Sequence, residues 1–86
     1  MAPITGSNRV PEHKRWRCQN PRCRITNSME EVNCARCGMR RDKGAHALTT
    51  DDLKIGELNC VFADGSEHWV YDTDSLMTIR LMAAAA

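Results

Sequence analysis

The chain has 86 residues, which is room for one small domain or two very small ones. Leu, Ile, Val and Phe account for only 14 residues, and a chain this short usually needs a metal, a disulfide or a partner in addition to its core. So small a core argues against a deep active-site pocket, and we expect no enzymatic activity. No apolar run approaches the roughly 18 residues of a membrane span.

Charge is distributed unevenly along the chain. Residues 1–43 carry ten Lys and Arg against four Asp and Glu, a net charge of +6, whereas residues 44–86 carry two against seven, a net charge of −5. The overall charge of +1 hides this difference. The change of sign at Lys43-Gly44 therefore separates two chemically different halves.

The order of the segments follows from composition. Residues 1–13 are polar and include Pro3, Gly6 and Pro11, so we expect a disordered arm. Residues 14–41 hold four of the five cysteines, residues 42–50 are predicted to be a linker, and residues 51–86 form a second small segment with an alanine tail. The first residues lack the apolar core of a secretory signal, which favours a nuclear or cytoplasmic location.

Four of the cysteines fall into two pairs. Four residues separate Cys18 from Cys23, two separate Cys34 from Cys37, and ten separate the pairs. Each pair can form a tight turn that presents two thiolates, and two such turns can close a tetrahedral metal site. Zinc suits this ligand set, and because four protein ligands leave no open position, the site would be structural.

Other fates of these cysteines are two disulfides, four free thiols or an iron site. The odd number of cysteines and the absence of a secretory signal argue against complete disulfide pairing. The spacing of four residues in the first pair disfavours a rubredoxin-like iron site. Zinc is therefore the leading cofactor prediction.

The residues around the cysteines follow the pattern W-x-C-x4-C-x3-N-x6-C-x2-C. This pattern resembles that of the Ran-binding protein 2-type zinc finger, over about residues 14–41 only. The resemblance implies a zinc ribbon of two short hairpins around one Zn²⁺ ion. It implies that the aromatic residue Trp16 packs under the ribbon and that Asn27 ties a loop to the backbone. The ligands that it implies are Cys18, Cys23, Cys34 and Cys37.

One branch of that family binds ubiquitin, through a Thr-Phe dipeptide after the second cysteine and an apolar residue before the fourth. The matching positions here are Arg24, Ile25 and Arg36. Only Ile25 keeps the apolar character, and burying the two arginines against an apolar surface would cost free energy. We therefore expect ubiquitin binding to be weak and atypical.

Another branch reads guanine in single-stranded RNA, with an aromatic residue after the asparagine, two arginines soon after it, and an asparagine after the third cysteine. The matching residues in this chain are Ser28, Glu30, Glu31 and Ala35. The stacking ring is absent, and carboxylates stand where guanidinium groups would bind. We expect no guanine selectivity.

Arginines are concentrated around the cysteines, and they allow two interpretations. They could shield the negative zinc–thiolate centre and dock against the acidic half, or they could form a basic surface that attracts an acidic partner or a phosphate backbone. The leading prediction is a zinc-binding protein-interaction module; low-specificity RNA binding is the alternative. The candidate partner-binding residues are Arg17, Arg22, Arg24, Ile25 and Arg36.

A further hairpin is predicted in residues 58–71. Two β-prone runs flank Asp64-Gly65, which favours a type I′ turn. Folding about this turn would place Leu58 opposite Tyr71, Cys60 opposite Trp69, and Phe62 opposite Glu67, with the apolar members on one face.

Residues 75–82 could cover that apolar face. They could do so as a helix capped by Thr73 or Asp74, or as a third strand with Met77, Ile79 and Leu81 pointing inward. The predicted fold class is a small zinc-stabilised β-rich protein. It combines the ribbon with a second hairpin and a short C-terminal helix or strand.

Overall fold

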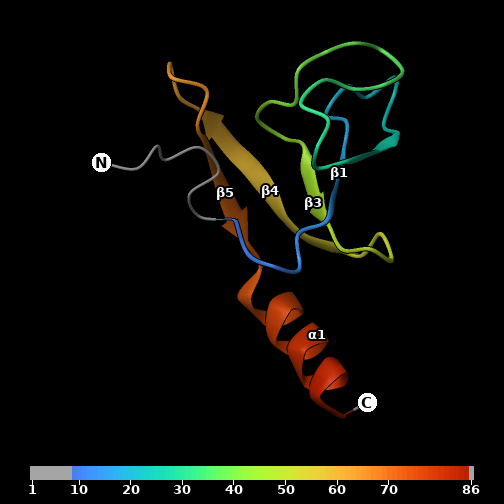
Figure 1. Cartoon of the computed structure of the whole chain (residues 1–86), viewed down its shortest axis with the longest axis vertical. Coiled ribbons are helices and arrows are strands. Elements are labelled where there is room, and N and C mark those ends of the chain that lie inside the picture. Colours follow the sequence, from blue (N-terminus) through green and yellow to red (C-terminus); the bar gives the residue numbers. More distant parts are fainter. Residues whose placement is uncertain (1–8, 86) are drawn as a thin grey trace.

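The computed structural model describes residues 9–85, which form a five-stranded antiparallel sheet and one C-terminal helix (Figure 1). The strand order across the sheet is β2-β1-β3-β4-β5. The elements are β1 (Arg15–Arg17), β2 (Thr26–Ser28), β3 (His46–Leu48), β4 (Lys54–Val61), β5 (Glu67–Tyr71) and α1 (Thr73–Ala85).

Strand β3 lies at the centre of the sheet, within residues 42–50, where we expected a linker. It pairs with β1 on one side and β4 on the other, so the basic and acidic halves share one sheet. Ala47 and Leu48 are fully buried. The linker prediction was wrong because three residues are too short a run to show a periodicity of two.

The hairpin around Asp64-Gly65 is present, but its turn and register differ from the prediction. Phe62 and Ser66 close a three-residue loop, in which Gly65 has a φ of +90° and Asp64 does not have a positive φ. This is the loop type in which a glycine follows a type I turn, rather than a two-residue type I′ turn. Leu58 consequently lies opposite Trp69 instead of Tyr71.

An irregularity between Leu58 and Cys60 changes which side chains share a face. Cys60 is opposite His68 rather than Trp69, and Glu67 is opposite Val61 rather than Phe62. Phe62 directly precedes the three-residue loop and is 51% exposed, so it does not join the buried face. A bulge adds one residue to one strand, and nothing in the apolar pattern of residues 58–63 marked it.

The C-terminal segment is a helix, and it is longer than predicted. Its N-terminal cap is Asp72, whose carboxylate accepts the backbone N–H of Asp74 and the hydroxyl of Ser75. Neither Thr73 nor Asp74 has this role. Figure 1 shows α1 leaving the end of the sheet that lies away from the cysteine loops. Among the side chains of α1 that the structure describes, only Leu76 and Ile79 pack on the core. Within residues 9–85 no helix is long and apolar enough to cross a membrane.

The face that carries Trp16, Leu58 and Trp69 is covered by the segment before β1 and by residues near the cysteines. His13 is buried, its ring lies 4.4 Å from that of Trp69, and its Nδ1 is 2.9 Å from the Tyr71 hydroxyl. Residues 9–13 were expected to belong to the disordered arm, but they form part of the folded unit; residues 1–8 lie outside the described residues.

Because His13 is buried, we expect the folded protein to lose stability in mild acid. Burial, together with the nearby charge of Arg9, lowers the pKa of His13 from 6.5 to about 4. Between these values the unfolded chain binds a proton that the folded chain does not, so stability falls as pH falls from 6.5 towards 4. Each pKa unit corresponds to about 1.4 kcal/mol, and the full loss is about 3 kcal/mol.

Urea unfolding of the metal-saturated chain at pH 7 and pH 5 measures this effect. His13→Gln should have a smaller pH dependence than the wild type, because the amide does not titrate but can still bind the Tyr71 hydroxyl. Equal pH dependence of the two proteins would contradict the role given to His13.

Candidate metal centre

Two backbone turns bring the cysteines together. Cys18 directly follows β1, and its N–H donates to Ile25, which closes the β1–β2 hairpin. In the second turn the Cys34 N–H donates to Met39, and the Gly38 N–H donates back to the Cys34 carbonyl. Gly38 has a φ of +78°, a conformation that favours glycine.

The sulfur atoms of Cys18, Cys23, Cys34 and Cys37 all lie within 4.8 Å of one another. Cys18 Sγ is 3.6 Å from Cys37 Sγ, and Cys23 Sγ is 3.5 Å from Cys34 Sγ. A tetrahedral zinc ion with Zn–S bonds of about 2.3 Å would hold its sulfurs about 3.8 Å apart. The four thiols therefore fit a metal ion, and Cys60 does not belong to the group.

The environment of the sulfurs differs from one thiol to another. Burial raises the pKa of the Cys18 thiol to about 12. Burial would also raise the pKa of Cys34, but the backbone N–H groups of Cys37 and Arg36 lower it to about 6. Such N–H groups, directed at a sulfur, favour its thiolate form, which is the form that binds metals.

Trp16 and Asn27 support the turns from the sheet. The Trp16 ring is fully buried, and its Nε1 donates to the carbonyl oxygens of Ser28 and Glu31, at 3.1 and 2.8 Å. The Asn27 side-chain Oδ1 accepts a hydrogen bond from the N–H of Ala35, the residue after Cys34, at 3.0 Å. These contacts connect β1 and β2 to the loop that carries the second cysteine pair.

Three arginines of the cysteine-rich half form ion pairs with the acidic half. Arg15 pairs with Asp52 at the surface, and Arg40 and Arg41 both contact Glu67. The Arg41 Nε lies 2.6 Å from Glu67 Oε2, and both side chains are buried. Charge asymmetry predicted that the two halves could dock, but no pattern marked Glu67 as the buried acid.

Arg41 also binds the cysteine-rich side of this junction. Its Nη1 donates to the carbonyl oxygens of Met29 and Glu31, and its guanidinium carbon lies 5.8 Å from the centre of the Trp16 ring. Burial alone would raise the pKa of Glu67, but the hydrogen bond and the charge of Arg41 have the larger opposite effect. The pKa of Glu67 is therefore below its usual value. This buried contact fixes the cysteine turns relative to β5.

The predicted partner-binding residues differ in how far they are exposed. Arg22, Arg24 and Arg36 are exposed and Arg17 is half-buried, and none of the four forms an ion pair within the described part of the chain. Ile25 is half-buried against the core, so only part of its side chain reaches the surface.

The four-cysteine group is thus a candidate metal centre at the end of β1, in a sheet that both halves of the chain build. Comparison with known proteins adds nothing to this assignment. No protein-family model matches the chain, and no curated protein and no solved structure matches it either.

Proposed function

We propose that the chain is a zinc-binding protein-interaction module, an adaptor without enzymatic activity, whose residues 14–41 are a Ran-binding protein 2-type finger. The observation that carries this proposal is the convergence of four cysteine sulfurs within 4.8 Å. One Zn²⁺ bound by four thiolates has no open position for water or substrate, so its role is to stabilise the fold. Binding free energy is then folding free energy for a chain with so small a core.

The interaction role is supported by the arginines that folding leaves free. Arg15, Arg40 and Arg41 are used internally, whereas Arg22, Arg24 and Arg36 are exposed without a carboxylate partner among residues 9–85. A planar guanidinium suits carboxylates of a protein partner as well as phosphates. Weak ubiquitin binding is a lesser proposal, because Ile25 is packed partly against the core.

The surface beside Asn27 favours a protein partner over sequence-specific RNA. Ser28, Glu30 and Glu31 are exposed there, and two of them are carboxylates that repel phosphate. We expect guanine-rich and uridine-only RNA to bind with similar, weak affinity at low salt. Both should dissociate near physiological salt, because counterion release drives such binding.

Fluorescence anisotropy with the two labelled RNAs tests this expectation. The variant Ser28→Trp with Glu30→Arg and Glu31→Arg should gain a preference for guanine, since base stacking is worth roughly 1–3 kcal/mol. Strong guanine selectivity of the unmodified chain at physiological salt would replace the adaptor proposal with RNA recognition. Protein partners that are captured from cell extract in the presence of nuclease would support the adaptor.

A further inference from the structure

A row of paired residues crosses the sheet on the face opposite Trp16. Arg17 lies opposite His46, His46 opposite Glu57, and Glu57 opposite Val70. Residues that face each other in antiparallel strands direct their side chains to the same side of the sheet. This face therefore joins β1 of the cysteine-rich half to β5 of the acidic half.

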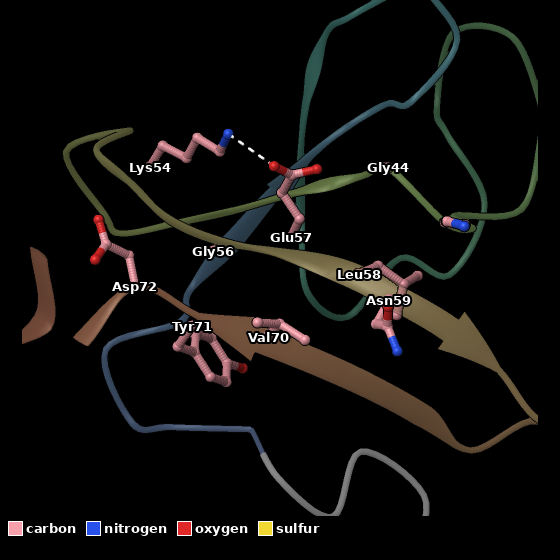
Figure 2. Close-up of a pocket in the computed structure, with 10 residues that line it drawn as sticks. Gly44, Lys54, Gly56, Glu57, Leu58, Asn59, Val70, Tyr71 and Asp72 are labelled. Carbon is pink, nitrogen blue, oxygen red and sulfur yellow. Dashed lines mark hydrogen bonds and ion pairs between the residues drawn. The ribbon is translucent and has the colours of Figure 1, made fainter.

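A cavity of about 570 Å³ lies on this face (Figure 2). Figure 2 shows Val70 between two ends of the cavity, one with Lys54 and Asp72 and the other with Gly44 and Asn59. Val70 is 52% exposed, although it is a valine in a strand. We call this cavity, together with the adjoining Arg17, Arg24 and His46, the outer groove.

Positive charge predominates in the outer groove. In the cavity lining, Lys43 and Lys54 balance Glu57 and Asp72, so the excess comes from Arg17 and Arg24, which both lie beside His46. Glu57 accepts from Lys54 Nζ at 3.0 Å, and Asp72 caps α1. The Arg24 guanidinium lies 3.5 Å from His46 Nδ1. Burial, with the positive charges of Lys54 and Arg24, lowers the pKa of His46, which fits an excess of cations here.

The backbone at Arg24 gives an independent indication. Its φ is +54°, in the left-handed region that glycine and asparagine occupy at less cost than arginine. The turn after Cys23 would therefore form more readily without an arginine at this position. The side chain is exposed, makes no ion pair within the described residues, and contacts His46 Nδ1, so this turn places the Arg24 guanidinium beside the groove.

We propose that the outer groove binds an acidic peptide segment of the protein partner, with an aliphatic side chain over Val70 and carboxylates at Arg17, Arg24 and Lys54. This proposal rests on the adaptor function and locates its binding surface. Such a groove suits a peptide better than RNA. Val70 is an exposed aliphatic side chain in the groove, which matches an apolar peptide side chain but not a phosphate, and Trp16 and Trp69 are buried, so neither offers a ring for base stacking.

Anisotropy of a fluorescein-labelled eight-residue peptide tests the groove directly. The probe contains Asp and Glu around one central Leu, and the zinc-loaded full chain is titrated in at 150 mM salt. We expect saturable binding that weakens at least tenfold with Arg17→Gln plus Arg24→Gln, and also with Val70→Glu. A probe with Gln and Asn in place of the acids should bind at least tenfold more weakly.

The matched control is Arg9→Gln plus Lys14→Gln, which removes the same charge from two exposed positions that do not line the groove. It should change the affinity for the peptide less than twofold. Equal weakening by the two double variants would show that the peptide responds only to the overall charge, which would overturn the groove proposal but leave the adaptor function with a surface elsewhere. Absence of peptide binding to the unmodified chain would likewise overturn the groove proposal and leave the adaptor function. Tighter binding of an eight-nucleotide uridine RNA than of the peptide would overturn both the groove and the adaptor proposals. Far-ultraviolet circular dichroism of each variant confirms that it is folded.

Discussion

Replacing Cys37 with serine should abolish most of the folded structure. Cys37 is exposed, so exchange of sulfur for oxygen removes little packing, and the effect that we expect follows from the loss of a proposed zinc ligand. Structural zinc contributes on the order of 10–16 kcal/mol in small domains, which is comparable to the whole stability of a folded protein. We expect the variant to lose about 5 kcal/mol or more, and circular dichroism with chemical denaturation measures this loss.

Cys60→Ser is the matched control, because Cys60 lies outside the group of four sulfurs. It should retain zinc and stability. Chelation of the unmodified chain should remove amide dispersion both from residues 15–41 and from residues 46–71, since β1 pairs with β3 in one sheet. Full zinc affinity in Cys37→Ser would refute the ligand assignment.

The second large effect is expected at the buried ion pair that joins the halves. Glu67→Gln removes the charge that faces Arg41, whose guanidinium then stays buried without a counter-charge. Breaking such a pair from one side typically costs about 3–5 kcal/mol. Urea unfolding of the zinc-loaded chain should show a loss of this size. Glu67 also accepts from Trp69 Nε1, at 3.2 Å, and this contact survives with an amide oxygen.

Glu57→Gln is the control for the same chemical change at the surface, where Glu57 pairs with the exposed Lys54. An exposed pair of this kind is worth about 0–1 kcal/mol, so stability should barely change. Adding Arg41→Met to Glu67→Gln should cost much less than the sum of the two single losses, because the charges act as a pair. Additive losses, or equal effects of Glu67→Gln and Glu57→Gln, would contradict this role of the pair.

The parts of the fold that could be predicted are those with a strong local signal. Paired cysteines predicted the sulfur cluster, and Asp64-Gly65 predicted the hairpin, because both depend on residues close in sequence. The choice between strand and helix after Tyr71 stayed open, since eight residues do not define a period. Asp72 decides the start of the helix by capping it.

The parts that could not be predicted depend on contacts between distant residues. Strand β3 has three residues, and only its two neighbours show that it is a strand. His13 is a polar residue in a polar segment, and its burial follows from Trp69 and Tyr71, which are more than 50 positions away. Glu67 likewise becomes a buried acid only when β5 meets Arg41.

Native mass spectrometry of the purified full chain tests most directly whether one zinc ion joins the four cysteines. We expect one zinc per chain and the loss of four protons, one from each of Cys18, Cys23, Cys34 and Cys37. A metal-free chain that is lighter by four hydrogens would instead show two disulfides. That mass, or the mass of a metal-free chain with all thiols intact, would contradict the account.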